Sequence, residues 1–160
     1  MRSSVKNTAG FTIIELLVVV IIIGILGTLV VTTYSGVQVK NRNSDRQLAL
    51  SILQGKLETY YAQHSKYPTA QELNTKSWQQ ANLKGVSAKD MRDPSWSKDS
   101  TSCAANDSAV FSESPTKDCY SYQVTTSEGS ACDNKEIACA QYTLTAQLEG
   151  GGKYVKSSLN

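Results

Sequence analysis

Histidine is nearly absent from this chain, and its scarcity excludes several kinds of functional site. The only histidine is His64, and no two of the four cysteines form a C-x-x-C pair, so zinc ligation is not expected. No serine lies in a nucleophile elbow, and no glycine-rich phosphate loop follows a predicted strand. The sequence therefore predicts no enzyme, no catalytic residue, no metal site and no cofactor.

An excess of one charge is also lacking. Sixteen basic and 14 acidic side chains give a formal net charge of +2, which does not predict nucleic-acid binding. One local basic group, Lys40, Arg42 and Arg46, lies just beyond a long apolar run. We interpret it as a solvated group where a helix leaving lipid meets water and headgroups. No specific nucleic-acid partner is predicted.

Charge is scarcest in the apolar run itself. From Phe11 to Val31 the chain has 21 residues and a single charge, Glu15. As a helix this run measures about 31 Å, which matches the ~30 Å hydrocarbon core of a bilayer. A carboxylate at the membrane centre costs ~2.5–3.5 kcal/mol, so Glu15 requires an explanation. We predict a transmembrane helix over residues 11–35.

The junction before this run carries the most specific motif. A polar, cationic leader, residues 1–10, ends in Gly10, and Phe11, Thr12 and Glu15 then open the apolar run. The pattern resembles the class III signal of type IV prepilins and of the related type II secretion pseudopilins. The resemblance implies cleavage after Gly10 and N-methylation of Phe11 by a membrane prepilin peptidase. It also implies that Glu15 is the carboxylate used in assembly.

The same resemblance implies the partners and the location. The subunit would polymerise with copies of itself into a helical filament, with an inner-membrane assembly platform and its ATPase machinery. It would reside in the cytoplasmic membrane as a precursor and then in an extracellular surface filament. Loss of the leader removes Arg2 and Lys6 and leaves 14 basic and 14 acidic side chains.

Two simpler interpretations of the N-terminus fit less well. A secretory signal has an apolar region of ~7–15 residues and then a small-x-small cleavage site. Here the run is longer, and residues 32–36 contain no such site. A plain single-pass anchor explains the length of the run, but it explains neither Glu15 nor the edge between Gly10 and Phe11.

The remainder, residues 36–160, predicts an α+β head of the pilin fold. Apolar residues at helical spacing form one stripe, which comprises Leu48, Ile52, Leu53, Leu57, Tyr60 and Tyr61. Tyr67 and Pro68 end this helix, and a short helix is predicted over 70–82 within a polar loop region, 74–118. Alternating residues predict antiparallel strands over 120–126, 142–148 and 154–156. A long N-terminal helix packed on a small antiparallel sheet is expected.

All four cysteines lie in the C-terminal third: Cys103, Cys119, Cys132 and Cys139. An even number on the outer side of a membrane anchor predicts two disulfides formed in an oxidising compartment. Sequence allows three connectivities. We favour Cys103–Cys119 with Cys132–Cys139, because each closes a local polar loop. The cluster 133–136 lacks the charge density and spacing of a calcium loop, and we interpret it as a polar turn.

Three functions are compatible with these features. A major pilin of a surface filament is favoured by the disulfide-rich head, and a pseudopilin of a type II secretion or DNA-uptake system is the alternative. A DNA-binding minor pilin would require a basic stripe on the head, and none is visible. In a filament, Glu15 is expected to pair with the Phe11 amine of a neighbouring subunit, because a helix N-terminus alone gives a carboxylate only ~0.3–1 kcal/mol.

Overall fold

The computed structural model describes residues 10–87, 90–97, 103 and 111–160, with only the backbone described at 29–33. The chain divides into two compact units, one ending at Gln38 and a second running Val39–Asn160. The second unit contains the globular head with its buried hydrophobic cluster.

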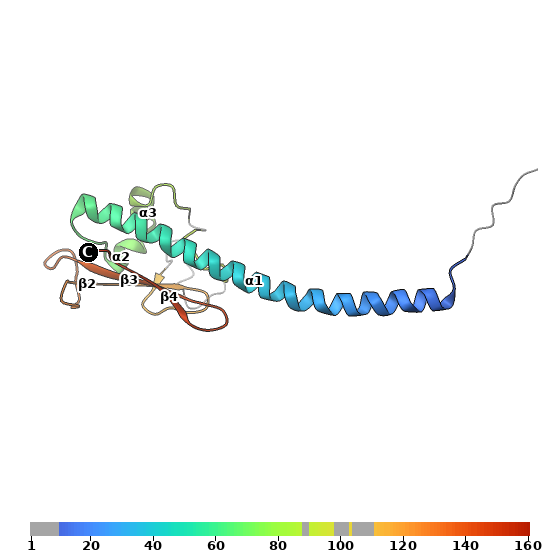
Figure 1. Ribbon diagram of the computed structural model, residues 1–160. Helices are drawn as coiled ribbons and strands as arrows, with labels where there is room; N and C mark the ends of the chain where they lie inside the picture. Colours follow the sequence, from blue (N-terminus) through green and yellow to red (C-terminus); the bar gives the residue numbers. More distant parts are fainter. Residues whose placement is uncertain (1–9, 88–89, 98–102, 104–110) are drawn as a thin grey trace, which may run out of the picture. The chain divides into compact units, whose positions relative to one another are not determined.

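A single helix, α1 (Ile13–His64), occupies 52 residues and extends from the first unit into the second (Figure 1). The helix is unbroken at the glycine-rich segment 24–28. Because the first proline of the sequence is Pro68, no residue before it removes a backbone donor from the helix. The helix ends at Ser65, whose φ of 56° places it in the left-handed region.

Two short helices follow where the sequence predicts one over 70–82. These are α2 (Ala70–Leu73) and α3 (Lys76–Asn82). Thr69 and Glu72 form a capping box at the start of α2. The interruption lies at Asn74, whose side chain donates to the Phe111 carbonyl at 3.0 Å and accepts from the Phe111 amide at 3.1 Å. A contact with a distant strand therefore divides the helix, and local sequence does not reveal it.

The sheet has four strands in the order β1-β2-β3-β4. They are β1 (Phe111–Ser112), β2 (Tyr120–Thr125), β3 (Gln141–Gln147) and β4 (Lys153–Ser157). The three antiparallel strands predicted from sequence are confirmed, and no boundary differs by more than one residue. Strand β1 was not predicted; it pairs with β2 in parallel and makes the sheet mixed. Two residues are too few to show an alternating pattern.

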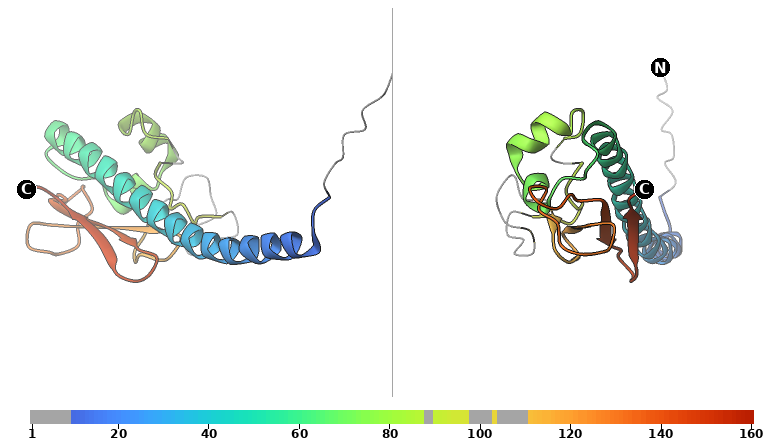
Figure 2. Two further views of the ribbon diagram at one scale, coloured as in Figure 1. Left: turned by 45° about the vertical axis from the view of Figure 1, so that its right-hand side comes forward. Right: turned by 90° about the vertical axis from the view of Figure 1, so that its left-hand side faces the viewer.

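The core lies between the second half of α1 and one face of this sheet. The view along the helix shows α2 and α3 on one side of α1 and the strands on another (Figure 2). The helix contributes Ala49, Leu50, Leu53 and Leu57, and the strands contribute Tyr120, Tyr122, Tyr142, Leu144 and Ala146. The predicted α+β fold, a long helix packed on a small sheet, is confirmed.

The predicted apolar stripe of α1 is wrong at two positions, and one residue outside the stripe is buried. Leu48 is 60% exposed and Ile52 is 37% exposed, although both were assigned to the buried face. Arg46, predicted to belong to a solvated basic group, is fully buried. The buried positions 46, 49, 50, 53, 57 and 60 follow the three- and four-residue helical spacing, so the period is as predicted and the face is rotated.

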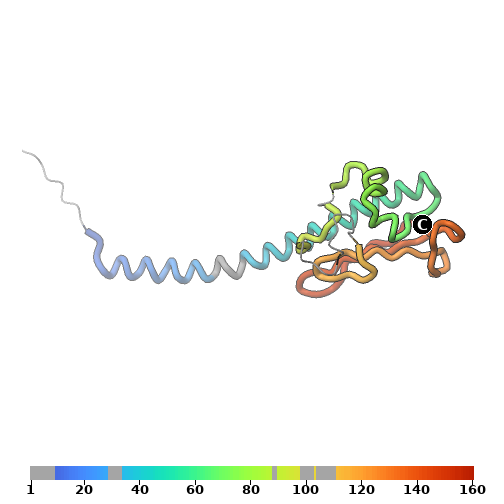
Figure 3. Tube along the Cα trace, turned by 180° about the vertical axis from the view of Figure 1, so that it is seen from behind, coloured from blue at the N-terminus to red at the C-terminus, as the bar shows by residue number. Residues whose placement is uncertain are grey.

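The C-terminus lies beside the last turns of α1 (Figure 3). Glu58 of α1 accepts hydrogen bonds from the hydroxyls of Tyr67 and Tyr142, both at 2.8 Å. It also accepts one from the Leu159 amide at 3.3 Å. This carboxylate connects the helix, the segment after it, strand β3 and the chain end.

Candidate processing and assembly site

The predicted cleavage junction lies outside regular structure. Gly10 and Phe11 precede α1, and both are exposed, Phe11 at 84%. Among the described residues, no atom lies within 4 Å of the place that a Cβ on Gly10 would occupy. Gly10 also has no positive φ. Nothing within the described chain therefore requires glycine at this position. We therefore expect the requirement to come from another protein that binds the junction.

Thr12 and Glu15 form a capping box at the start of α1. The Glu15 carboxylate accepts from the Thr12 backbone amide at 2.9 Å and from the Thr12 hydroxyl at 2.8 Å. The Glu15 amide donates to the Thr12 hydroxyl at 3.3 Å. This reciprocal arrangement satisfies two amides that a helix start leaves without partners. In the single chain these hydrogen bonds hold the Glu15 carboxylate at Thr12, the residue that follows Phe11.

The sequence contains a local signal for this capping box, and the prediction for Glu15 did not include it. Thr12-x-x-Glu15 directly before an apolar run is the pattern of a capping box. The prediction considered only the attraction between the Glu15 charge and the helix dipole. The hydrogen bonds give this carboxylate a defined position in the unassembled subunit, in addition to its predicted role between subunits.

The first turns of α1 expose a continuous set of large apolar side chains. Each is roughly half exposed or more, and the set comprises Ile13, Ile14, Leu16, Leu17, Val18, Val19, Val20, Ile21, Ile22, Ile23, Ile25 and Leu26. Exposed apolar surface of this extent marks an interaction site. Within the part of the chain that the structure describes, no helix is long and apolar enough to cross a membrane. The predicted run continues to Val31, and the side chains of 29–33 lie outside the described residues.

A buried network of charges joins α1 to two loops of the head. Arg46 donates to both carboxylate oxygens of Asp93, at 2.7 and 2.8 Å, and both side chains are fully buried. Arg46 also donates to Glu149 at 2.9 Å, and Arg42 donates to the same carboxylate at 2.6 Å. These guanidinium groups lower the pKa of Glu149 to about 2.

This network corrects the interpretation of the basic group. Arg42 and Arg46 are not solvated charges at a headgroup layer, because both pair with carboxylates of the head. Their partners stand 47 to 107 residues away in the sequence, in loops that carry no pairing motif. Lys40 is exposed, as predicted.

The structure contains two disulfides, Cys103–Cys119 and Cys132–Cys139, with Cα–Cα distances of 5.7 and 5.2 Å. This is the pairing that we favoured from the sequence. Residues 104–110 of the first loop lie outside the described part. The second loop is described completely.

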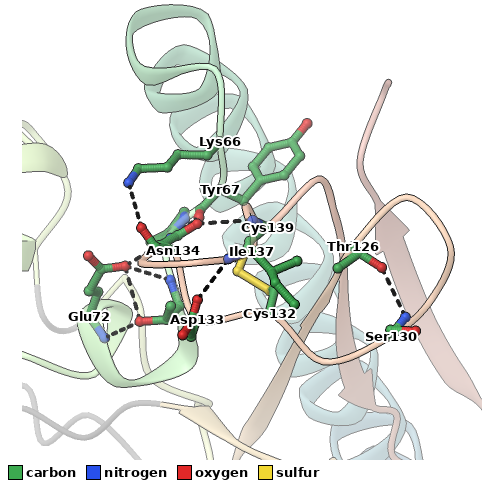
Figure 4. The surroundings of a disulfide bond; sticks show 12 residues. Lys66, Tyr67, Glu72, Thr126, Ser130, Cys132, Asp133, Asn134, Ile137 and Cys139 are labelled. Atoms are coloured by element: carbon green, nitrogen blue, oxygen red, sulfur yellow. Dashed lines mark hydrogen bonds between the residues drawn. A yellow bond between two sulfur atoms is a disulfide. The ribbon is translucent and has the colours of Figure 1, made fainter.

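Asn134 fastens the second loop to the segment immediately after α1 (Figure 4). Its amide group donates to the Tyr67 carbonyl at 2.7 Å, and its side-chain oxygen accepts from the Cys139 amide at 3.0 Å. The Tyr67 amide donates to the Cys139 carbonyl at 2.8 Å. Asn134 has a φ of 62°, a conformation that asparagine tolerates better than most residues.

The Asp133 side chain forms hydrogen bonds within the loop itself. One carboxylate oxygen of Asp133 accepts from the amides of residues 135, 136 and 137, at 2.9 to 3.1 Å, and these bonds lower the Asp133 pKa. Among the described residues, no group of three potential ligands could hold a metal ion. His64 is exposed beside the Tyr60 ring, with 4.2 Å between ring centroids.

Comparison with known proteins identifies the N-terminal region. Residues 5–31 match the prokaryotic N-terminal methylation motif. The chain is 39% identical over 70 residues to type II secretion system core protein G of Klebsiella pneumoniae, over 42% of this chain and 48% of that protein. The protein of the same name in Dickeya chrysanthemi is 38% identical over 70 residues, 42% of this chain and 44% of the relative. These matches support the resemblance of the N-terminal region to type IV prepilins and to type II secretion pseudopilins.

The matches agree with the prediction of a structural subunit of the pilin type rather than an enzyme. A third relative, core protein G of Escherichia coli, is 37% identical over 75 residues, 45% of this chain and 49% of that protein. The chain thus spans about half the length of the curated relatives it matches. No solved structure matches it significantly.

Proposed function

We propose that this chain is a pseudopilin of a type II secretion system, a subunit that polymerises through its apolar N-terminal helix. The observation that carries the proposal is the 36–39% identity, over 66 to 75 residues, to six proteins named type II secretion system core protein G. This similarity favours the pseudopilin, which was the alternative on sequence grounds, over the major pilin of a surface pilus.

Processing at the junction of Gly10 and Phe11 is the first step of the proposal. The bond lies in an exposed, non-helical segment, where a protease can bind an extended chain. No described contact requires glycine at position 10. Its presence therefore supports recognition by a peptidase whose binding pocket a side chain would obstruct. The precursor, residues 1–160, would be retained in the cytoplasmic membrane through 11–35, and the head, 36–160, would lie outside it. Prepilin peptidase, an assembly platform and its ATPase are the proposed partners.

Glu15 is proposed to guide assembly after processing. Cleavage creates a positive amine on Phe11, which is methylated and stays cationic. The capping box holds the Glu15 carboxylate close to the same end of the helix, where the Phe11 amine of a neighbouring subunit can reach it. Pairing opposite charges is how apolar surroundings tolerate them, and it would fix the axial register of the subunits.

One observation supports the second candidate, a major pilin of a surface pilus. The head carries two disulfides, which suit a fibre exposed outside the cell. Such a filament would serve adhesion or twitching motility rather than secretion. Both candidates account for the first 30 residues equally well, and they differ in where the filament ends.

The deciding experiment deletes this gene in its own host and measures two outputs. Loss of secreted enzymes from the medium, with surface fibres unchanged, is expected for the pseudopilin. Loss of surface fibres with normal secretion would overturn this proposal in favour of the pilin. Both measurements are repeated after complementation with the wild-type gene.

A matched pair of glycine variants tests processing. Gly10→Val should leave a full-length, membrane-retained precursor and no filament, because the added side chain obstructs the peptidase. Gly55→Ala is the control, since a Cβ there also meets no described atom within 4 Å and alanine favours the helix by roughly 1 kcal/mol. Filaments of Gly10→Val that retain residues 1–10, detected by intact mass, would contradict cleavage as a requirement.

A further inference from the structure

An apolar groove is lined by α1, by the 90–96 segment and by Tyr120 of β2. Its volume is about 510 Å³, and α1 lines it with Leu48 and Ile52. The opposite wall comes from the 90–96 segment, with Pro94 and Trp96. Leu48 is 60% exposed, so two apolar helix residues and an indole border an open hollow. Apolar residues gathered around one hollow differ from scattered exposed ones and mark an interaction site.

The charged side chains that line the groove are three aspartates and Arg92. Asp45 and Asp90 line it and are exposed, whereas Asp93, also in the wall, is neutralised by Arg46. Arg92 lies over the Trp96 ring, 4.0 Å from its centroid. Tyr120 closes the groove from β2, and its buried hydroxyl has no hydrogen-bond partner among the described residues. An apolar, cationic occupant that also offers a hydrogen-bond acceptor fits this lining.

The head itself carries a surface of that chemistry on β4. Val155 is 49% exposed, and Lys153 is exposed on the same side of the strand. Residues 150–160 include two lysines and no acidic side chain. In the described part of the chain neither lysine makes an ion pair. Ile137 is another exposed apolar residue of the head. It follows Glu136, whose negative charge would be repelled by Asp45 and Asp90 at the groove.

We propose that the groove between α1 and the 90–96 segment binds the outer face of β4 of a second copy of this chain. Val155 would enter the apolar hollow, and Lys153 would pair with Asp45 or Asp90. This inference rests on the proposed function, because it assigns a head-to-head contact within the polymer.

The positions of the two surfaces agree with a polymer. The groove is bordered by β2, whereas β4 is the edge strand beyond β3, so the two surfaces are different patches of one head. When the groove of one copy binds β4 of a second copy, β4 of the first copy and the groove of the second copy remain free. Repeated, it generates an open helical filament rather than a closed dimer, unless the rotation happens to close a ring.

Charge exchange tests the contact in cells that process and assemble the protein. Asp45→Lys and Lys153→Glu should each reduce the yield of filaments at least about fivefold, and the double variant should restore at least half of it. Glu128→Lys, an exposed acid in the turn after β2, is the matched control and should assemble normally. Normal yield from both single variants, or no recovery in the double variant, would overturn the contact while leaving the filament itself established.

Cross-linking gives a second readout that does not depend on yield or on the fold of a charge variant. Leu48→Cys with Val155→Cys should produce a ladder of dimers, trimers and longer species from non-reduced filaments. The control pair, Leu48→Cys with Glu128→Cys, should give no ladder. A band that stops at the dimer, or a Leu48→Cys adduct with a different protein, would overturn the proposal. If the wild type forms no filament at all, the proposed function fails and this contact fails with it.

Discussion

Glu149 shows how one side chain in a turn connects distant parts of the head. The turn continues through Gly150, Gly151 and Gly152, which all have a positive φ that other residues rarely adopt. Three glycines allow the chain to reverse so that the Glu149 carboxylate, 26% exposed, reaches Arg42 and Arg46. The β3–β4 connection is thereby held to α1 by charge as well as by packing.

The depressed pKa of Glu149 predicts a dependence of stability on pH. A carboxylate with a pKa of about 2 in the folded chain and 4.5 as its ordinary value stabilises the fold above pH 4.5. That contribution is lost progressively as the pH falls from 4.5 toward 2. Denaturant titrations of the mature protein in detergent should show this decline, and Glu149→Gln should make it shallower. The control Glu128→Gln, exposed in a turn, should keep the wild-type profile; an unchanged slope in Glu149→Gln would contradict the assignment.

Glu15 yields a prediction about assembly. Glu15→Ala removes a charge that is costly in lipid, so insertion should be at least as efficient as in the wild type. Processing should continue, because the peptidase recognises the junction at Gly10. Filaments should be sparse or absent, since each Phe11 amine would then lack a partner. Isolated filaments and membranes, both probed for the mature form, measure the two effects separately.

A normal filament yield from Glu15→Ala would mean that packing of the apolar helices alone orders the subunits. Thr12→Val is the informative companion, because it removes the hydroxyl of the capping box and keeps the carboxylate. Loss of such a cap costs a helix about 1 kcal/mol, so Thr12→Val should assemble better than Glu15→Ala.

At the scale of the element, the loop closed by Cys132 and Cys139 is hydrogen-bonded to the segment where the chain leaves α1. The Asn134 side chain binds the backbone of that segment at Tyr67 and the backbone of its own loop at Cys139 (Figure 4). The Lys66 ammonium donates to the Asn134 carbonyl at 3.2 Å. The helix exit and the start of β3 are thereby held together by polar contacts beside the apolar core.

Asn134→Ala should destabilise the head by about 2–3 kcal/mol, because hydrogen bonds to two backbone groups are lost and alanine disfavours a positive φ. Asn134→Gly loses the same hydrogen bonds but tolerates the conformation, so it should be the less damaging variant. Chemical denaturation of the mature protein measures both. A change below about 0.5 kcal/mol in Asn134→Ala would show that the disulfide alone secures the loop.

At the scale of the whole molecule, two disulfides and a buried ion pair stabilise a head with a small core. Closed loops of this size are expected to contribute ~2–4 kcal/mol each in the chain-entropy model. Mass spectrometry of the unreduced mature protein should therefore detect no free thiol, and peptide mapping should recover the Cys103–Cys119 and Cys132–Cys139 pairs. Alkylation of any of the four cysteines before reduction would contradict this.

The Arg46–Asp93 pair should be the most sensitive point of the head. Removing one partner of a fully buried pair leaves an uncompensated charge and costs ~3–5 kcal/mol. Arg46→Ala should therefore lower the free energy of unfolding by about this amount, which denaturation of the mature protein measures. The control Lys40→Ala, at an exposed position of the same helix, should change it by less than about 0.5 kcal/mol. Similar losses in the two variants would contradict the importance of the pair.

The sequence by itself determined the features that depend on local pattern. The junction at Gly10 and Phe11, the apolar run with Glu15, the helix end before Pro68 and the three alternating strands are each encoded within a few consecutive residues. Such signals depend on residue spacing and on backbone chemistry, and both are legible in one dimension.

Only the tertiary structure decided which side of α1 is buried and what the charges do. Arg46 is buried because Asp93 and Glu149 arrive from distant loops to compensate its charge, and its burial rotates the core face so that Leu48 and Ile52 point outward. The break at Asn74 and the parallel strand β1 likewise depend on one long-range contact, with Phe111. A pairing between residues 37 to 107 positions apart leaves no periodic trace in the chain, because its energy arises only when the fold brings the partners together.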